Sequence, residues 1–385
     1  MVKFAHLADV HLGGWRQQEL RDLNFKSFQI AIDNCIKEKV EFVLMAGDLF
    51  DSPYPPIEIL KETFGEFKKL NQAGIPCFII AGSHDYSVSG KTFLDVLEKT
   101  GFCKNVTDFD ETEEKITLKP TIHNDVAIYG FPGKKTGLEI KDLRKIKLQD
   151  SSLFKILMLH TTIDKAKGDL PIDSIDQDSL PYSDYCALGH IHIKLHYKNF
   201  VYPGPVFPNN FAELEDLHHG HYCIVDTSKE DYLKRIEIKI KEVETVLFET
   251  HDALTATEEI ISEINKRNID DKIVLLRIIG ELERGKTSDI NFQKINDFVK
   301  EKGAYFILRN IHKLKEKEAN FGFEIQDDEN IEEETIKLYS EQNPSEFNSL
   351  VLQLMNSLSI EKQEGETSET FTRRVLEESK KILKF

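Results

Sequence analysis

The sequence predicts an α/β fold, because short apolar runs alternate with amphipathic helical stretches from residue 1 to about residue 230. The apolar runs have the length of buried strands, and they read in order VKFAHLAD, EFVLMAGD, CFIIAGS, VAIYGF, FKILMLH, YCALGH and HYCIVD. Most of them end in Asp, Ser or His. Because α/β folds collect their sites where strands give way to loops, we expect the chemistry of this chain at those ends.

A second α/β pattern follows from about residue 236 to residue 312. RIEIKIKEVE, KIVLLRIIG and AYFILRN predict three strands, with helices between them at about Leu254–Arg267 and Asp289–Lys302. The acidic run QDDENIEEE at 326–334 is typical of a solvated linker.

Two amphipathic helices are expected after the linker, with Gly365 in the turn between them. The first would carry an apolar stripe of Phe347, Leu350, Val351, Leu354 and Leu358, and the second one of Phe371, Val375 and Ile382. A chain of 385 residues has room for two domains and an appendage. We therefore expect domains at 1–232 and 233–315, a linker at 316–343 and a helical segment at 344–385.

The formal net charge of −17 excludes a protein coated in positive charge, although a local cationic groove is compatible with it. The five cysteines are odd in number, far apart and mostly within apolar runs, which indicates buried thiols in a reducing compartment. The start lacks the charge and apolar pattern of a signal peptide, and no apolar run reaches membrane-spanning length. These features predict a cytoplasmic protein with no membrane association.

Residues with metal-binding side chains recur in short motifs along the first 192 residues. They are Asp9 and His11 in DVH, Asp48 in GD, Ser83 and His84 in GSHD, His160 in MLH, and His190 and His192 in GHIH. Phosphoester hydrolysis at two metal ions needs a carboxylate that bridges the ions and His, Asp or Asn ligands around them. The ordered set therefore predicts a two-metal hydrolytic centre.

This ordered set resembles the motifs of the calcineurin-like metallophosphoesterases, which have Asn at the position of Ser83. The resemblance implies an α/β/β/α sandwich, with Asp9, His11, Asp48 and His192 around one metal. It places Asp48, Ser83, His160 and His190 around the other, with Asp48 bridging. His84 would be the catalytic acid and not a ligand. Mixed carboxylate and imidazole ligation fits manganese better than calcium or magnesium, so two Mn²⁺ per chain are expected, although other divalent ions are possible.

Within that superfamily, HLADVHLG, GDLFD, GSHDYS, ALGHIH and YPGP are similar to segments of the meiotic recombination eleven family, SbcD in bacteria. The similarity implies a manganese-dependent DNA nuclease of double-strand-break repair, acting as a 3′–5′ exonuclease, an endonuclease or both. It also implies a DNA-capping second domain and a homodimer that acts on DNA ends at the nucleoid. The terminal helices would dock onto an SMC-like coiled-coil ABC ATPase, or they could fold back on the core of the chain itself.

Two residues depart from the pattern. The side chain of Ser83 is one bond shorter than that of Asn, so it should weaken one metal site without destroying it, unless it only caps the following turn. Asp51 stands where many relatives carry a histidine linked to exonucleolytic processing, which leaves open the balance between exonuclease and endonuclease action.

The loops near the predicted metals carry four candidate DNA contacts, Arg16, Tyr86, Lys91 and Lys194. Sequence-independent binding needs such charge beside the scissile phosphate. GELERGKT at 280–287 matches the phosphate-binding P-loop pattern, but Glu281 and Glu283 would stand in its anion cradle. An exposed turn is the expected structure there.

Three functions are compatible with the metal motifs. The first is the DNA nuclease. The second is a phosphoprotein phosphatase or small phosphodiesterase, although serine/threonine phosphatases have GDxxDRG and GNHE where this chain has GDLFDS and GSHD. The third is a noncatalytic assembly subunit, which requires that Ser83 abolishes metal binding.

Overall fold

The computed structural model describes residues 1–85, 92–134, 139–168, 172–316, 336, 340, 345, 347–358, 360 and 368–383. The chain divides into two compact units, Met1–Glu316 and Lys317–Phe385. Each unit is treated by itself.

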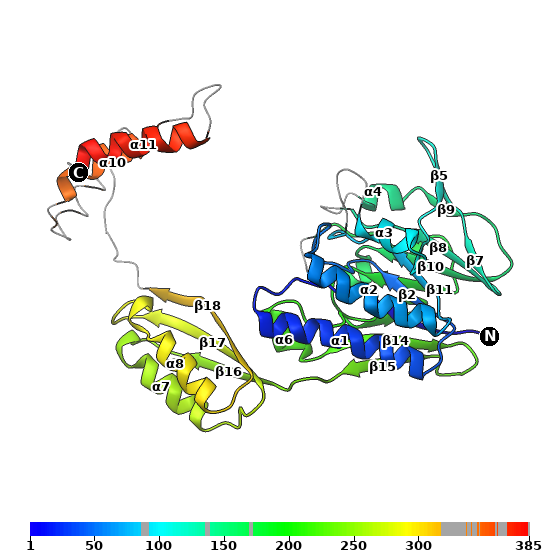
Figure 1. The fold of residues 1–385 in the computed structure, drawn as a ribbon, viewed down its shortest axis with the longest axis horizontal. Coiled ribbons are helices and arrows are strands. Elements are labelled where there is room, and N and C mark those ends of the chain that lie inside the picture. The colour runs from blue at the N-terminus through cyan, green and yellow to red at the C-terminus, as the bar shows by residue number, and fades with distance from the viewer. Residues whose placement is uncertain are drawn as a thin grey trace. The chain divides into compact units, whose positions relative to one another are not determined.

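Two six-stranded sheets form the centre of the first unit (Figure 1). One has the order β15-β14-β1-β2-β3-β4, with β1 Lys3–Leu7, β2 Phe42–Ala46, β3 Cys77–Ile80, β4 Lys104–Asn105, β14 Gly220–Asp226 and β15 Leu233–Ile238. The other has the order β12-β13-β11-β10-β8-β7, with β7 Thr121–His123, β8 Val126–Phe131, β10 Phe154–His160, β11 Tyr185–Gly189, β12 Leu195–Tyr197 and β13 Phe200–Tyr202. β1 to β4 run parallel to one another, as do β8, β10, β11 and β13.

The two sheets pack face to face around a shared apolar core. Phe4 and Phe42 of the first sheet belong to the same buried cluster as Ile128 and Met158 of the second. The opposite face of the first sheet packs under helices, so its central strands are buried on both faces. This double burial explains why the strand sequences are continuous apolar runs without alternation.

Helices and a small sheet form the outer layers. α1 Gln18–Lys37, α2 Ile57–Gln72 and α3 Phe93–Lys99 cover the first sheet. α4 Glu139–Leu143 and a three-stranded sheet of β5 Phe109–Glu111, β6 Ile116–Leu118 and β9 Ile146–Leu148 cover the second. α5 Asp164–Lys167, a 3₁₀ turn at Gln177–Ser179 and α6 Phe211–Leu217 complete this part of the chain. The predicted α/β/β/α sandwich is confirmed.

The prediction of one second-domain strand over RIEIKIKEVE is wrong. Its first half belongs to β15, which pairs antiparallel with β14 of the first sheet. Ile238 is buried in the apolar core beside that sheet and Ile236 packs against the same core. Burial of these two side chains therefore favours pairing of this segment with the first sheet. The first sheet therefore includes residues through Ile238, and the next strand begins at Val243.

Residues 243–316, called the second domain below, form a parallel three-stranded sheet with helices on one face, within the single compact unit Met1–Glu316. The sheet has the order β16-β17-β18, with β16 Val243–Glu249, β17 Ile273–Leu282 and β18 Phe306–Glu316. α7 Ala253–Asn265 and α8 Phe292–Glu301 share its buried apolar cluster, and Figure 1 shows both helices on the same side of the sheet. The other face places Ile273 and Leu275 against Leu20, Leu23 and Leu214 of the first domain.

The segment that matches a P-loop is an exposed turn, as predicted. β17 continues through Leu282, and a short 3₁₀ turn at Thr287–Asp289 follows. The backbone N–H of Glu283 donates to the His251 carbonyl, and the N–H of Thr287 donates to the Glu316 carboxylate. Because these donors are already engaged by the protein, the turn does not form an anion cradle.

The described part of the second unit contains two helices that pack on each other, α10 Val351–Leu358 and α11 Ser368–Leu383, after a 3₁₀ turn at Asn348–Leu350. Phe347, Leu358 and Leu376 remain exposed. The predicted turn at Gly365 and most of the predicted linker lie outside the described residues. Among the described helices, none combines the length and apolar character that crossing a bilayer requires.

Candidate metal centre

The predicted ligands lie where parallel strands end. Asp9 and His11 follow β1, Asp48 follows β2, Ser83 and His84 follow β3, His160 is the last residue of β10, and His190 and His192 follow β11. β1, β2 and β3 are parallel neighbours in one sheet, and β10 and β11 are parallel neighbours in the other. The topology therefore brings the ends of five strands from both sheets to one edge of the sandwich.

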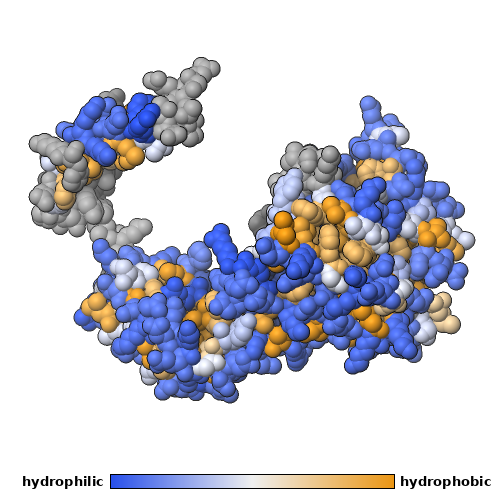
Figure 2. Space-filling model, viewed as in Figure 1, coloured by the Kyte–Doolittle hydropathy of each residue, from blue (hydrophilic) through white to orange (hydrophobic). Residues whose placement is uncertain are grey.

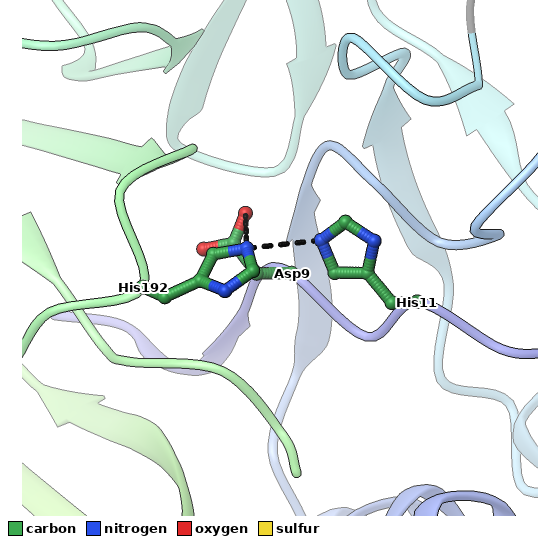
Figure 3. Close-up of side chains that lie close together, drawn as sticks. All are labelled: Asp9, His11 and His192. Atoms are coloured by element: carbon green, nitrogen blue, oxygen red, sulfur yellow. Dashed lines mark hydrogen bonds and ion pairs between the residues drawn. The ribbon is translucent and has the colours of Figure 1, made fainter. Parts of the chain in front are cut away.

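One group of potential ligand atoms comes from Asp9, His11 and His192, whose side chains point toward one another (Figure 3). The Nε2 atoms of His11 and His192 are 3.0 Å apart, and His192 Nε2 is 4.0 Å from Asp9 Oδ1. The other ring nitrogens face carboxylates: His11 Nδ1 is 3.2 Å from Asp51 Oδ1, and His192 Nδ1 is 2.9 Å from Glu213 Oε1.

The second group comes from Asp48, His160 and His190. His160 Nε2 lies 3.0 Å from Asp48 Oδ2, and His160 Nδ1 faces the carbonyl oxygen of Ala46 at 2.9 Å. Asp48 also lies 3.6 Å from His11 Nε2, so it stands between the two groups. This is the position that a bridging carboxylate needs.

Charge and burial set the protonation of these groups when no metal is bound. Burial alone would raise the pKa of Asp48, but the charge and hydrogen bond of His160 hold it well below its usual value. Burial disfavours a charged His160, yet Asp48 raises its pKa to about 10. His192 is likewise buried, and its hydrogen bond with Glu213 raises its pKa to about 9. Burial and the nearby His160 lower the pKa of His190 to about 4.

These residues fit divalent metal ions. Because both Nδ1 atoms in the first group face carboxylates, the close contact between the two Nε2 atoms needs a cation between them, either a proton or a metal ion. In the second group, His160 Nδ1 faces the Ala46 carbonyl oxygen, so the buried Nε2 is directed at Asp48 Oδ2 at 3.0 Å. Buried imidazole and carboxylate atoms that converge in this way are typical ligands of first-row divalent ions.

Ser83 and His84 lie beside the second group. The Ser83 hydroxyl donates to Asp48 Oδ2 at 3.4 Å, so it faces the bridging position. The His84 backbone N–H donates to Asp48 Oδ1 at 2.7 Å, and its ring Nδ1 is 2.9 Å from the Asp51 carbonyl oxygen. The His84 side chain is about half exposed, and one of its ring nitrogens lies within 4.8 Å of ligand atoms of His11 and Asp48.

Asp85 connects the loops that carry these residues. Its carboxylate accepts hydrogen bonds from the N–H groups of Leu49, Phe50 and Gly82 at 3.0 to 3.1 Å. Burial, with the nearby charge of Asp48, raises its pKa to about 6. Asp85 therefore ties the loop after β2 to the loop after β3.

An open cleft lies over the ligands. Asp48, Ser83, His84, His190 and His192 line one part of it, and Ile191, Ile193, Ala212, Glu213, Asp216 and Leu217 line the rest. Of the predicted DNA contacts, Arg16 and Lys194 are exposed, and Lys194 follows directly after a lining residue. Tyr86 and Lys91 lie outside the described residues.

Sequence reasoning missed two residues that orient the ligand histidines. Glu213 could not be recognised as a partner of His192, because Asn210 and Glu213 have the spacing of a helix N-cap signature. That signature explains both residues, and Asn210 does cap α6. Asp51 was noted only as a departure from a family pattern, whereas its carboxylate meets His11 Nδ1. The place of Asp51 three residues after Asp48 is a sequence signal that could have indicated its role, whereas Glu213 carries no such signal.

Several curated proteins are similar to this chain over much of its length. A protein of Methanosarcina mazei described as "DNA double-strand break repair protein Mre11" is 27% identical over 82% of this chain and 50% of its own length. The protein of the same description from Methanocaldococcus jannaschii is 27% identical over 76% of each chain. The "Uncharacterized metallophosphoesterase YhaO" of Bacillus subtilis is 28% identical over 58% of this chain and 57% of its own.

This chain spans only about half the length of several of these relatives. Residues 2–194 match the sequence profile described as Calcineurin-like phosphoesterase, and this range contains all the predicted metal ligands and His84. The match covers half of the chain, and the two-sheet sandwich with ligands at its strand ends agrees with it. The chain therefore belongs to the calcineurin-like phosphoesterase family.

Proposed function

We propose that this chain is a manganese-dependent DNA nuclease that hydrolyses phosphodiester bonds at two metal ions, as a 3′–5′ exonuclease, an endonuclease or both. The observation that carries the proposal is the adjacency of two ligand groups, with Asp48 between them, beneath an open cleft. The repair proteins named Mre11 among the relatives support DNA as the substrate.

Asp9, His11, Asp48 and His192 would hold one metal, and Asp48, Ser83, His160 and His190 the other. Two bound divalent ions would supply a water nucleophile and offset negative charge on the phosphate oxygens. The protein orients this centre with Asp51 and Glu213, which fix the Nδ1 sides of His11 and His192 and direct both Nε2 atoms inward.

His84 would act as the general acid. Its Nδ1 faces the Asp51 carbonyl oxygen, which accepts only, so Nδ1 carries the proton in the neutral ring. A second proton on Nε2 would then face the cleft, where it could pass to the leaving oxygen of the cleaved ester. The ring is about half exposed, so it would be accessible to a substrate bound in the cleft.

We further propose that the remaining surfaces serve a larger assembly at DNA ends in the cytoplasm. Arg16, Tyr86, Lys91 and Lys194 would contact phosphates, and the second domain would cap the DNA. The exposed apolar side chains of the terminal helices would dock onto an SMC-like coiled-coil ATPase. Figure 2 shows apolar side chains over α2 and α3, where Ile57 and Val96 are exposed, and this patch would support a homodimer.

Substrate choice decides among the possible functions. Purified protein with Mn²⁺ is incubated with labelled duplex, hairpin and single-stranded DNA, and separately with p-nitrophenyl phosphate mono- and diesters. The nuclease proposal predicts cleavage of DNA. Hydrolysis of a phosphomonoester alone would indicate a phosphatase, hydrolysis of a small diester alone would indicate a small phosphodiesterase, and no turnover would indicate an assembly subunit.

His84→Gln separates catalysis from metal binding. Loss of the acid should lower the DNA cleavage rate about 10²-fold or more, because proton transfer to the leaving group typically contributes that much. Both metals should still bind, as measured by calorimetry and by anomalous scattering from crystals. A variant that has lost one metal would show instead that His84 is a ligand.

A further inference from the structure

α6 lies between the candidate metal centre and the second domain. It begins at an Asn210 cap and is only seven residues long. Leu214 is fully buried in an apolar cluster that includes Ile273 and Leu275 of β17. The helix therefore packs directly against the sheet of the second domain, and its other side lines the cleft.

Glu213, on the first turn of α6, is held on both carboxylate oxygens. Oε1 faces His192 Nδ1 at 2.9 Å, and Oε2 accepts from the backbone N–H of Asn209 at 2.8 Å. A carboxylate fixed at two points cannot turn away from the imidazole without breaking a second bond. The orientation of the His192 ring therefore depends on where the first turn of α6 sits.

Glu215, two residues later, is bound by the second domain. The guanidinium of Arg277 on β17 donates to both of its carboxylate oxygens, with Nε at 3.0 Å from Oε1. The same guanidinium stacks on the ring of Phe211 at 4.9 Å. Two-point contact of this kind fixes geometry as well as charge. Arg277 thus holds α6 at its first residue and at its middle.

We propose that α6 couples the second domain to the metal centre, with Glu213 as the positioning residue for His192 and the Arg277–Glu215 pair as the link to β17. The position of the β16-β17-β18 sheet against α6 then sets the affinity of the metal held by Asp9, His11 and His192. This inference rests on the metal centre of the proposed function and deepens it by naming its regulation.

Manganese titration of the metal-stripped full chain by calorimetry tests the coupling. Glu213→Gln keeps the size of the side chain and removes its charge, and it should weaken one of the two manganese sites about 10- to 100-fold, as loss of a carboxylate partner of a ligand histidine typically does. Arg277→Met and Glu215→Gln touch no ligand and should weaken the same site about 2- to 30-fold. Anomalous scattering at limiting manganese identifies the weakened site.

Two further variants provide a control and a rescue for this test. Arg284→Met removes a surface ion pair with Asp252 in the same domain, away from α6, and should leave manganese affinity unchanged. The charge swap Arg277→Glu with Glu215→Arg should recover most of the affinity lost by Arg277→Met. Because the swap restores the ion pair, recovery of manganese affinity would show that the loss in Arg277→Met comes from the coupling and not from a general loss of stability. Thermal unfolding of each metal-free variant measures stability separately.

Unchanged manganese affinity in Glu213→Gln, or in both Arg277→Met and Glu215→Gln, would overturn the proposal. An equal loss in Arg284→Met would do the same. The readout uses no substrate, so it is separate from the nuclease test. A chain that binds manganese and cleaves no DNA would refute the proposed function and leave the coupling to be judged by these affinities.

Discussion

The backbone at the metal centre is strained at single residues. Asp9, His11, Asp48, His190 and His192 all have positive φ, with values of 53°, 47°, 52°, 113° and 51°. Such conformations cost about 1–3 kcal/mol each for residues with a side chain. Hydrogen bonds between the loops offset part of the cost, for example from the His11 N–H to the Asp48 carbonyl and from the His190 N–H to Asp9 Oδ1. Ligand convergence is therefore achieved at the expense of local stability.

Glycine at position 82 leaves room for Asp48. A Cβ atom on Gly82 would lie 2.2 Å from Asp48 Oδ1 and 2.4 Å from its backbone N. Gly82→Ala should therefore displace the carboxylate and weaken manganese binding about 10-fold or more, with a loss of stability of about 1–3 kcal/mol. Calorimetry and thermal unfolding measure the two effects.

Gly65 in α2 is the matched control, because a Cβ atom there would meet nothing within 4 Å. Gly65→Ala should leave manganese affinity unchanged and stabilise the helix by about 0.5–1 kcal/mol. Equal metal affinity in both alanine variants would contradict the packing argument.

Ser83→Asn should tighten the metal held by Asp48, His160 and His190. The Ser83 hydroxyl already faces Asp48, but it is one bond shorter than an asparagine amide, and metal–oxygen bonds near 2.0–2.2 Å tolerate little stretching. At limiting manganese, we expect this site to be less occupied than the one at Asp9, His11 and His192 in the natural chain. Equal occupancies, with no gain in the asparagine variant, would rule this out.

At the residue scale, the sequence was sufficient to predict which side chains converge at the strand ends and insufficient to predict the residues that orient them. The motifs around Asp9, Asp48 and His190 are recognisable because the chemistry restricts the residue types. Glu213 lies 21 residues from the histidine it orients, in a helix that reads as an ordinary surface element. A contact of that kind depends on tertiary packing, which a single sequence does not display.

At the level of elements, strand positions were predictable and strand partners were not. Each buried run of the first domain was recognised because a strand covered on both faces must be apolar throughout. RIEIK was assigned to the second domain because periodicity describes a strand without saying which sheet it joins. The antiparallel pairing of β15 with β14 decides that question in the fold.

The terminal helices form an element that can be removed. Met1–Glu316 is compact by itself, so deletion of 341–385 should leave its unfolding temperature nearly unchanged. The proposed manganese-dependent cleavage of short DNA should persist, while the proposed association with a coiled-coil ATPase should be lost, because the exposed apolar side chains of the tail are gone. Circular dichroism, a nuclease assay and co-purification measure these effects. Unfolding of the truncated chain would show that the helices belong to its core.

For the molecule as a whole, the acidic composition does not oppose the DNA binding that we propose for the cleft. The formal charge of −17 acts over the surface, where salt screens it beyond about 8–10 Å. Two divalent ions would bring four positive charges to the metal centre, of which about two remain as a net gain once His160 and His192 have released their extra protons. Metal loading would therefore make the cleft locally attractive to phosphate while the protein as a whole remains acidic. Removal of the metal should therefore lower DNA affinity more than a change in the charge of distant surface residues does.

Metal loading should also release protons. Without metal, the pKa values of His160 and His192 are raised to about 10 and about 9, so both rings carry an extra proton at neutral pH. A metal needs the neutral imidazole, so binding must expel these protons, and manganese affinity should rise with pH until the rings are neutral. Below pH 8 we expect the release of about two protons per chain. Calorimetry at pH 7 in Tris and in Pipes, whose ionisation enthalpies differ, measures the number released. His160→Gln should reduce the number of protons released by about one. Equal heats in the two buffers would show that no protons are released and that the imidazole rings are already neutral before the metal binds.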